Sequence, residues 1–518
     1  MLKMVDGTGI IGVDMVCPLG GAVSPPQPPN YDNVEMEGMG SLTLQNSLKA
    51  PLERLELIGN STQGENPAPD NPQEIESVGR KSKNLLNLQK QPDVKETYLG
   101  WKVSDGRNVV LSVKDKGNNA DITGCYLGLS RTGGSSDGVV WVVNNGSVAV
   151  KEVVSKNQYV SVFPSNETTV RKLLERFDIQ VEYGNNATDY EPYGYLLDVK
   201  VTGENLLSNK PTDWMIGKTT SWGAVPQTPV SYGKNVKNAI ATINVKSSTN
   251  YSFINKETNK LWVCRIIELD ANGLGLVNHA LYANESFNYK KYNFSTRSNT
   301  ANIVFEIKKV DNTELLSTDI ESNKIMLVEG EVNESTPYEP YTEQAMQIVL
   351  DEPLRGIGDY KDTITKDGVV RKIKRTVFDG GEDEKWGIAI ERENVINFVS
   401  TQFSDAIKIN EHQRSMMDKL KWSSGVWGRD EVGQDMFARI LRMNMPKTLT
   451  PDLQTFKTWL SQNPLTVDYV LAEPVTEPLP ESVQDQLSAL HSENGTTHVF
   501  VDSGEVPCGI KLTYRKEK

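Results

Sequence analysis

The sequence predicts a mainly β, multidomain protein with two jelly-roll-like antiparallel β-sandwich modules, a C-terminal β-rich α+β domain and an extended N-terminal arm. The chain has 518 residues, enough for three or four domains at about 100–200 residues each. Short runs rich in Val, Ile, Tyr and Trp, separated by Gly, Asn and Asp turns, recur along much of it. Two phrases also recur, Asn-Leu-Leu from Asn84 and Asn205, and Tyr-Glu-Pro-Tyr from Tyr190 and Tyr338.

The recurring phrases indicate a duplicated module of domain size. The two Asn-Leu-Leu openings lie roughly 120 residues apart, well beyond the period of about 20–50 residues that solenoid repeats have. We therefore expect one sandwich at residues 84–195 and its duplicate at residues 204–342. Pro192 and Pro340 cannot donate to a strand ladder, so each is expected at the close of an edge strand or in the exit turn.

Residues 1–83 have the composition of an arm. Proline-rich stretches at residues 24–29 and 66–72 predict stiff, polyproline-like linkers. Between them, residues 42–58 alternate well enough to form a strand pair that packs on another subunit. The alternative is a tethered tail with local order.

The region 345–518 differs from the modules because helix signals join the strand patterns. A hairpin is expected around Lys366-Asp367-Gly368. One helix is expected after Thr450 as N-cap, with Pro451 at its first position, and a second from Pro480. Several strands flank them, which predicts a β-rich α+β domain.

Charge and cysteine usage exclude some classes of function. The net charge is −13, from 68 acidic and 55 basic residues mixed along the chain, so a clustered basic footprint for nucleic acid is missing. The four cysteines show no C-x-x-C spacing, which argues against a disulfide scaffold and a structural zinc site and favours synthesis in a reducing cytoplasm. No run of 18 apolar residues exists, so membrane insertion is not expected.

Sequence motifs for catalysis are missing too. The chain has no Gly-x-Ser-x-Gly elbow, Walker loop or Rossmann fingerprint, and no cofactor is expected. Its isolated histidines, without metal-binding spacing, are His279, His412, His491 and His498. A glycosidase needs only two carboxylates placed by the fold, so a glycan-cleaving enzyme stays open as an alternative.

Aromatic residues are the better candidates for a binding site. The flat C–H faces of sugars stack on Trp or Tyr, while Asn and Asp bond their hydroxyls. Tryptophans in or beside turn-rich segments, with one neighbouring amide, form the predicted glycan-binding set: Trp101, Trp141, Asn144, Trp214 and Trp222. The alternative is that these rings fill the cores of the sandwiches; Trp262, within an apolar run, is expected in a core.

Several phrases in fixed order resemble a known group of proteins. They are Asn205-Leu206-Leu207, residues 324–330 with 336–341, residues 354–362, residues 456–474 with 496–500, and the linker at residues 59–75. Together they resemble minor structural proteins of tailed bacteriophages and prophages of Gram-positive bacteria. The likeness covers about residues 46–518, and it supplies no catalytic or binding residues.

The resemblance implies a tail-tip, baseplate or tail-fibre component of a virion, made in the host cytoplasm and released by lysis. Its modules would resemble carbohydrate-binding modules and adhere to host cell-wall or capsular polysaccharide. It also implies a homotrimer, which with duplicated sites would raise avidity by about 10²–10⁴. Residues 1–83 are expected to dock on other tail or baseplate proteins. Two alternatives remain: a purely structural baseplate protein, and a glycan-cleaving depolymerase.

Overall fold

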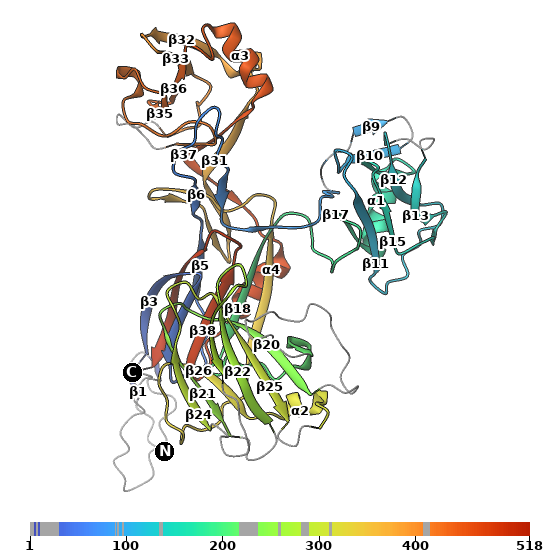
Figure 1. Cartoon of the computed structure of the whole chain (residues 1–518), viewed down its shortest axis with the longest axis vertical. Helices are drawn as coiled ribbons and strands as arrows, with labels where there is room; N and C mark the ends of the chain where they lie inside the picture. Colours follow the sequence, from blue (N-terminus) through green and yellow to red (C-terminus); the bar gives the residue numbers. More distant parts are fainter. Residues whose placement is uncertain are drawn as a thin grey trace.

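The fold is mainly β and multidomain, as the sequence predicts. The computed structural model describes residues 5–6, 9–10, 31–88, 90, 93–95, 98–133, 138–216, 237–256, 261–280, 290–309, 313–407 and 415–517. Figure 1 shows a central body with one lobe above it, one lobe to its right and a third packed against it. All pairings between named strands are antiparallel in these ranges, as expected when strands are joined by hairpins and long returns.

The central body is a sandwich of two sheets. The first central sheet runs in the order β27 (Glu343–Leu350), β18 (Tyr195–Thr202), β38 (Gly495–Asp502) and β4 (Ser41–Asn46), with β8 (Arg80–Lys81) beside β18. The second runs in the order β3 (Tyr31–Met39), β39 (Gly509–Glu517), β5 (Arg54–Ile58), β30 (Thr363–Thr365), β31 (Gly368–Phe378), β37 (Leu465–Glu477) and β34 (Met416–Met417). Separate two-stranded sheets are formed by β1 (Val5–Asp6) with β2 (Gly9–Ile10), β6 (Ser61–Gln63) with β7 (Ile75–Ser77), and β28 (Gly356–Ile357) with β29 (Tyr360–Lys361).

Residues 31–83 do not form the arm expected from their composition. Leu42 and Leu44 in β4, and Leu55 and Leu57 in β5, are buried in the core between the two central sheets. Their alternation with exposed or half-exposed neighbours is the period of two that a half-buried strand requires. The strand pair therefore packs within its own chain, on strands near the C-terminus. Of the expected linkers, residues 66–72 lie in the described range and residues 24–29 lie outside it.

The first module consists of two sheets and a helix. Its larger sheet has the order β14 (Ser147–Val148), β13 (Val140–Asn144), β12 (Tyr126–Ser130), β16 (Tyr159–Phe163), β10 (Tyr98–Lys102) and β9 (Asp93–Lys95). Its smaller sheet has the order β15 (Glu152–Ser155), β11 (Val109–Asp115) and β17 (Phe177–Tyr183). The helix α1 (Glu167–Arg176) precedes β17 and is capped by Asn166, whose side chain accepts from the Thr169 N–H at 2.8 Å.

The second module repeats this plan. Its larger sheet has the order β19 (Trp214–Ile216), β20 (Asn238–Asn244), β25 (Asn302–Lys309), β22 (Leu261–Leu269) and β23 (Gly275–Ala280). Its smaller sheet has the order β24 (Lys291–Ser295), β21 (Asn250–Asn255) and β26 (Ile325–Glu329). The 3₁₀ turn η1 (Pro211–Asp213) precedes β19, and the helix α2 (Ser317–Glu321) precedes β26.

The strand orders of the two modules correspond element by element. The order β13-β12-β16-β10 matches β23-β22-β25-β20, and β15-β11-β17 matches β24-β21-β26, with a helix before the last strand in both. The short recurring phrases of the sequence thus mark a repeat of the whole topology.

Buried asparagines explain why the phrases recur. The Asn84 side chain accepts from the backbone N–H groups of Leu86 and Val181, both at 3.1 Å, and donates to the Ile179 and Glu191 carbonyls at 3.1 and 3.2 Å. It joins the entry of the module to its last strand and to the Tyr-Glu-Pro-Tyr exit.

Asn205 makes the equivalent bonds in the second module. Its side chain accepts from Leu207 and Leu327 at 3.0 and 3.2 Å and donates to the Glu339 carbonyl at 3.2 Å. We call this arrangement the asparagine clamp. It holds the two ends of each module side by side.

The upper lobe occupies the middle of the region expected as a single C-terminal domain. It contains η2 (Glu382–Glu384), η3 (Val426–Gly428), the helix α3 (Leu453–Gln462) and a sheet in the order β32 (Trp386–Glu391), β33 (Val395–Ser400), β36 (Ile440–Pro446) and β35 (Gly433–Phe437). Its core stacks Phe398 on Phe456 at 4.0 Å between ring centroids. The hairpin of β30 and β31 and the helix α4 (Glu481–Ala489) belong to the central sandwich, while the ends of β31 and β37 contribute Phe378 and Leu465 to the core of the lobe.

Each lobe is an insertion between strands of the central sandwich. The chain leaves after β8 and returns in β18, leaves again and returns in β27, and leaves after β31 to return in β37. The sequence order of the modules is therefore retained, but the body that carries them is assembled from distant segments.

The helix α3 begins two residues later than predicted from Thr450. Asp452 is its cap, and the Asp452 side chain accepts from the Thr455 N–H at 2.7 Å.

The asparagine clamp can be tested one module at a time. Asn84→Ala and Asn205→Ala each leave buried backbone groups without partners, at a cost of about 1–3 kcal/mol per group. We expect Asn205→Ala to speed hydrogen exchange in β26 while β17 stays protected, and Asn84→Ala to do the reverse. The exposed Asn333→Ala is the matched control. If either variant accelerated hydrogen exchange equally in β17 and β26, the result would contradict the clamp.

Candidate glycan-binding face

Two of the predicted tryptophans are core residues. Trp101 in β10 is 6% exposed and its indole N–H donates to the Lys90 carbonyl at 3.0 Å. Trp214 in β19 is 4% exposed and donates to the Ser208 carbonyl at 2.8 Å. Both rings are enclosed and their polar atoms are satisfied, so neither presents a face to a sugar. Trp222 lies outside the described residues, and so does the side chain of Trp262.

Trp141 and Asn144 lie at the surface of the first module. Both belong to β13, where the Trp141 ring is half-buried and Asn144 is exposed. Trp141 makes an edge-to-face contact with Tyr126 on the neighbouring strand β12, with 5.6 Å between ring centroids. The structure therefore brings these two predicted residues together on one strand of the larger sheet.

Trp141 is the end of a row of aromatic rings. Next to Tyr126 lies Phe163 of β16 at 5.5 Å, and next to Phe163 lies Tyr98 of β10 at 5.0 Å in a stacked arrangement. The four rings are half-buried and lie on four adjacent strands. Tyr126 is directly opposite Phe163, whereas Trp141 is opposite Gly128, two residues further along β12. We call Tyr98, Phe163, Tyr126 and Trp141 the aromatic row.

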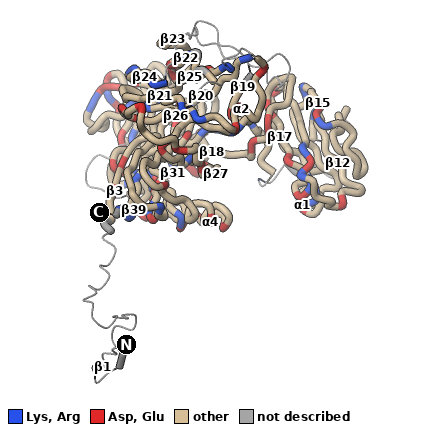
Figure 2. Tube along the Cα trace, turned by 90° about the horizontal axis from the view of Figure 1, so that it is seen from below, with Lys and Arg blue, Asp and Glu red and all other residues tan. Residues whose placement is uncertain are grey.

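The pleat explains why the row points outward. Leu127 and Val162, the neighbours of Tyr126 and Phe163, are fully buried in the module core. Because successive side chains of a strand point to opposite faces, the rings lie on the outer face of the sheet. Figures 1 and 2 both place β12 on the side of the lobe that faces away from the central sandwich, with β17 nearer to it.

The corresponding face of the larger sheet in the second module carries different side chains. Ile240, Ile267 and Val304 form a buried aliphatic cluster there, in place of half-exposed rings. The duplicated modules have thus diverged in the side chains of their outer faces while keeping their strand order.

The second module is fixed to the first central sheet by a group of polar side chains. Lys246 and Glu329 of the module form an ion pair at 2.9 Å, and Thr43 of β4 donates to Glu329 at 3.1 Å. Thr43 also bonds Nδ1 of His498 in β38 at 3.0 Å. His498 is fully buried, and this burial lowers its pKa to about 4, against the opposing influence of Glu329.

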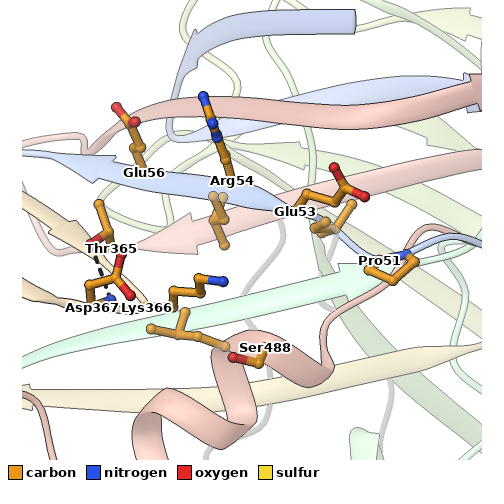
Figure 3. A pocket seen from close by; sticks show the side chains of 11 residues that line it. Pro51, Glu53, Arg54, Glu56, Thr365, Lys366, Asp367 and Ser488 are labelled. Carbon is orange, nitrogen blue, oxygen red and sulfur yellow. Dashed lines mark hydrogen bonds between the residues drawn. The ribbon is translucent and has the colours of Figure 1, made fainter. Parts of the chain in front are cut away.

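A separate cavity opens on the central body. It has a volume of about 740 Å³ and lies between β5, the turn after β30 and the end of α4 (Figure 3). Leu52, Leu55 and Leu487 are buried beneath it, while Glu53 and Arg54 are exposed at its rim. The rim carries both signs of charge, and Glu53 is paired with Arg515 at 2.9 Å.

The described part of the chain offers few other sites for chemistry. It contains no group of three or more His, Cys, Asp or Glu side chains that could hold a metal ion. No helix in the described ranges is long and apolar enough to cross a membrane. The described surface carries interspersed charges of both signs (Figure 2). His279 lies in β23, His498 in β38 and His491 between α4 and β38, and His412 lies outside the described residues.

Comparisons with known proteins leave the family open. No protein-family model matches the chain, and no curated protein matches it. Among solved structures, the infectious bursal disease virus VP2 subviral particle aligns over 96% of this chain and 84% of that chain, at 8% identity and a TM-score of 0.11. The Gx strain of the same virus aligns over 95% and 84%, at 8% identity and a TM-score of 0.12. Scores this low carry no argument about fold or function.

The buried His498 makes the stability of the chain depend on pH. Its pKa of about 4 in the folded protein lies below the value of about 6.5 in an unfolded chain, so the unfolded state takes up the proton first as the pH falls. The free energy of unfolding should therefore decrease between pH 6.5 and 4, by up to about 3 kcal/mol. The groups facing the ring are Thr43, Glu329 and Lys246.

Melting curves of the wild type and of His498→Gln between pH 7 and 4.5 measure this dependence. The variant has no imidazole to protonate, so its melting temperature should fall less steeply than that of the wild type. Parallel pH profiles would show that His498 is not the group responsible.

Proposed function

We propose that this chain is a virion structural protein of a phage tail tip, baseplate or tail fibre that adheres to glycan on the host cell surface. The observation that carries the proposal is the aromatic row on the outer face of the first module. The fold adds a second support, because sandwich modules held on a central body suit a protein that presents binding faces outward.

The aromatic row has the chemistry that a glycan requires. Its half-buried rings offer apolar surface to the C–H faces of sugars, and the exposed amide of Asn144 can bond hydroxyl groups at the Trp141 end. Single sugar contacts of this kind are weak. A homotrimer, which we propose as the assembly, would raise the avidity by presenting several faces to one cell wall.

The second module supports a different use of the same fold. Its Trp214 is buried, as expected of a purely structural module, and its larger sheet carries a buried aliphatic cluster on the face turned away from the module core. We propose that its main contact is with the central sheet of its own chain. In this proposal the first module binds the host glycan, and the second module is part of the body that carries the first.

Glycan adhesion is tested by mixing the labelled full chain with isolated cell walls from a panel of Gram-positive bacteria, scoring bound protein and released reducing sugar. We expect binding to some strains without sugar release. In Trp141→Ala we expect the affinity for the cell wall to fall at least about tenfold, which corresponds to about 1.4 kcal/mol of binding free energy. Trp427→Ala is the matched control, since Trp427 is 51% exposed in the upper lobe. Equal binding by both variants would exclude the aromatic row, and sugar release would indicate a depolymerase.

Docking on the particle is tested at the N-terminus. Because residues 31–83 supply β3, β4 and β5 of the central sandwich, removing residues 1–83 would destroy the fold. Removing residues 1–30 spares these strands. We expect that truncation to prevent incorporation into particles while cell-wall binding is retained. Normal incorporation of the truncated chain would place the docking surface elsewhere.

A further inference from the structure

A pocket lies where the second module meets the first central sheet. Its volume is about 290 Å³, near the lower end of the range of about 300–1,000 Å³ found for small-molecule sites. The space could hold about ten water molecules at about 30 Å³ each, which suits one small ring better than a chain. Its walls combine polar and aromatic groups from both bodies: Lys200, Thr202, Ser208, Asp213, Tyr341 and Phe500.

The fold explains how these groups converge. Lys200 and Thr202 are successive outward-facing residues of β18, and Phe500 lies directly opposite Lys200 on β38. Asp213 comes from the turn η1 and Tyr341 from the Tyr-Glu-Pro-Tyr exit of the second module. The corresponding exit tyrosine of the first module, Tyr193, is 40% exposed, whereas Tyr341 is 8% exposed.

The two positive charges beside the pocket, Lys200 and Lys210, are matched by two acidic side chains, Glu343 and Asp213. Glu343 pairs with Lys200 and with Lys210, each at 3.0 Å, and accepts from the Tyr341 hydroxyl. Burial alone would raise the pKa of Glu343, but these hydrogen bonds lower it to about 2, so the carboxylate is charged at neutral pH. The pocket is therefore suited to a neutral ligand better than to an anion.

Thr202 supplies an unpaired polar group in the wall. Its side chain is buried, with 2% exposure, and its hydroxyl has no hydrogen-bond partner among the described residues. A buried hydroxyl without a partner is uncommon because it loses its bonds to water and gains none in return. A bound molecule with hydroxyl groups would supply the missing partner after a small rotation of the threonine side chain.

We propose that this pocket binds a single neutral sugar ring. Tyr341 and Phe500 provide apolar surface for the C–H face, while Asp213 accepts hydrogen bonds from ring hydroxyls. Lys200 can donate hydrogen bonds from the pocket wall, and Thr202 can both donate and accept. The site is separate from the aromatic row and does not rest on it. The ring can be a free monosaccharide or the terminal residue of a glycan.

Saturation-transfer NMR on the full chain tests the site with glucose, galactose, N-acetylglucosamine and rhamnose, and with oligosaccharides that end in each. We expect at least one sugar to bind, and Thr202→Val and Asp213→Asn to weaken it about tenfold. Thr202→Val keeps the side-chain shape and removes an unpaired hydroxyl, so its melting temperature should be unchanged or higher. Trp141→Ala is the control and should leave this binding intact.

The outcomes separate the two sites and the two sources of the sugar. Binding by monosaccharides alone supports a free sugar as the ligand, and competition between monosaccharide and oligosaccharide supports a terminal residue. Binding that neither Thr202→Val nor Asp213→Asn weakens overturns the assignment, as does the absence of any signal across the panel. Loss of cell-wall adhesion in Trp141→Ala, with monosaccharide binding retained, would support two separate binding sites.

Discussion

The architecture depends on the hydrogen bonds of two buried asparagines. Asn84 and Asn205 each hold the entry of a module against its last strand and its exit, so the two ends of the module emerge together. β18 runs from the first exit to the second entry, and it pairs along its full length with β27, which follows the second exit. Domains whose ends lie close together can be inserted without disturbing their host. The central sandwich tolerates large insertions for this reason.

The duplicated modules have taken different positions and different surfaces. The first is joined to the body at its clamped end and keeps half-exposed rings on its outer sheet. The second is fixed to the central sheet through Lys246, Glu329, Thr43 and His498, and its outer face is aliphatic. The same fold therefore presents an exposed face in the first module and packs against the central sheet in the second. The proposed sugar pocket arises only from that joint.

Part of this organisation could be predicted from the sequence because its signals are local. The duplication is marked by recurring phrases, and the hairpin of β30 and β31 by Lys366-Asp367-Gly368. The central sandwich is not local: Thr43 and His498 bond each other across 455 positions of the chain. Alternating leucines indicated strands at residues 42–58 but not where their partners lie. From the sequence alone, packing on another subunit is therefore an equally reasonable expectation for those leucines.

The candidate site was predictable to a similar extent. Trp141 and Asn144 could be singled out because they border a turn, but the same reasoning selected Trp101 and Trp214, which fill cores. Tyr98, Tyr126 and Phe163 were missed because their contact depends on strand register. Each of them is next to a residue that faces the core, so alternation within the strand is the signal that could have found them.

Cell-wall binding by residues 82–194 expressed alone tests the asparagine clamp and the aromatic row together. If the clamp closes the module and the aromatic row binds glycan, this segment should melt cooperatively and bind the same strains as the full chain. Its binding should be lost in Trp141→Ala. An unfolded segment would contradict the clamp, and a folded segment that binds no cell wall would contradict the assignment of adhesion to the first module.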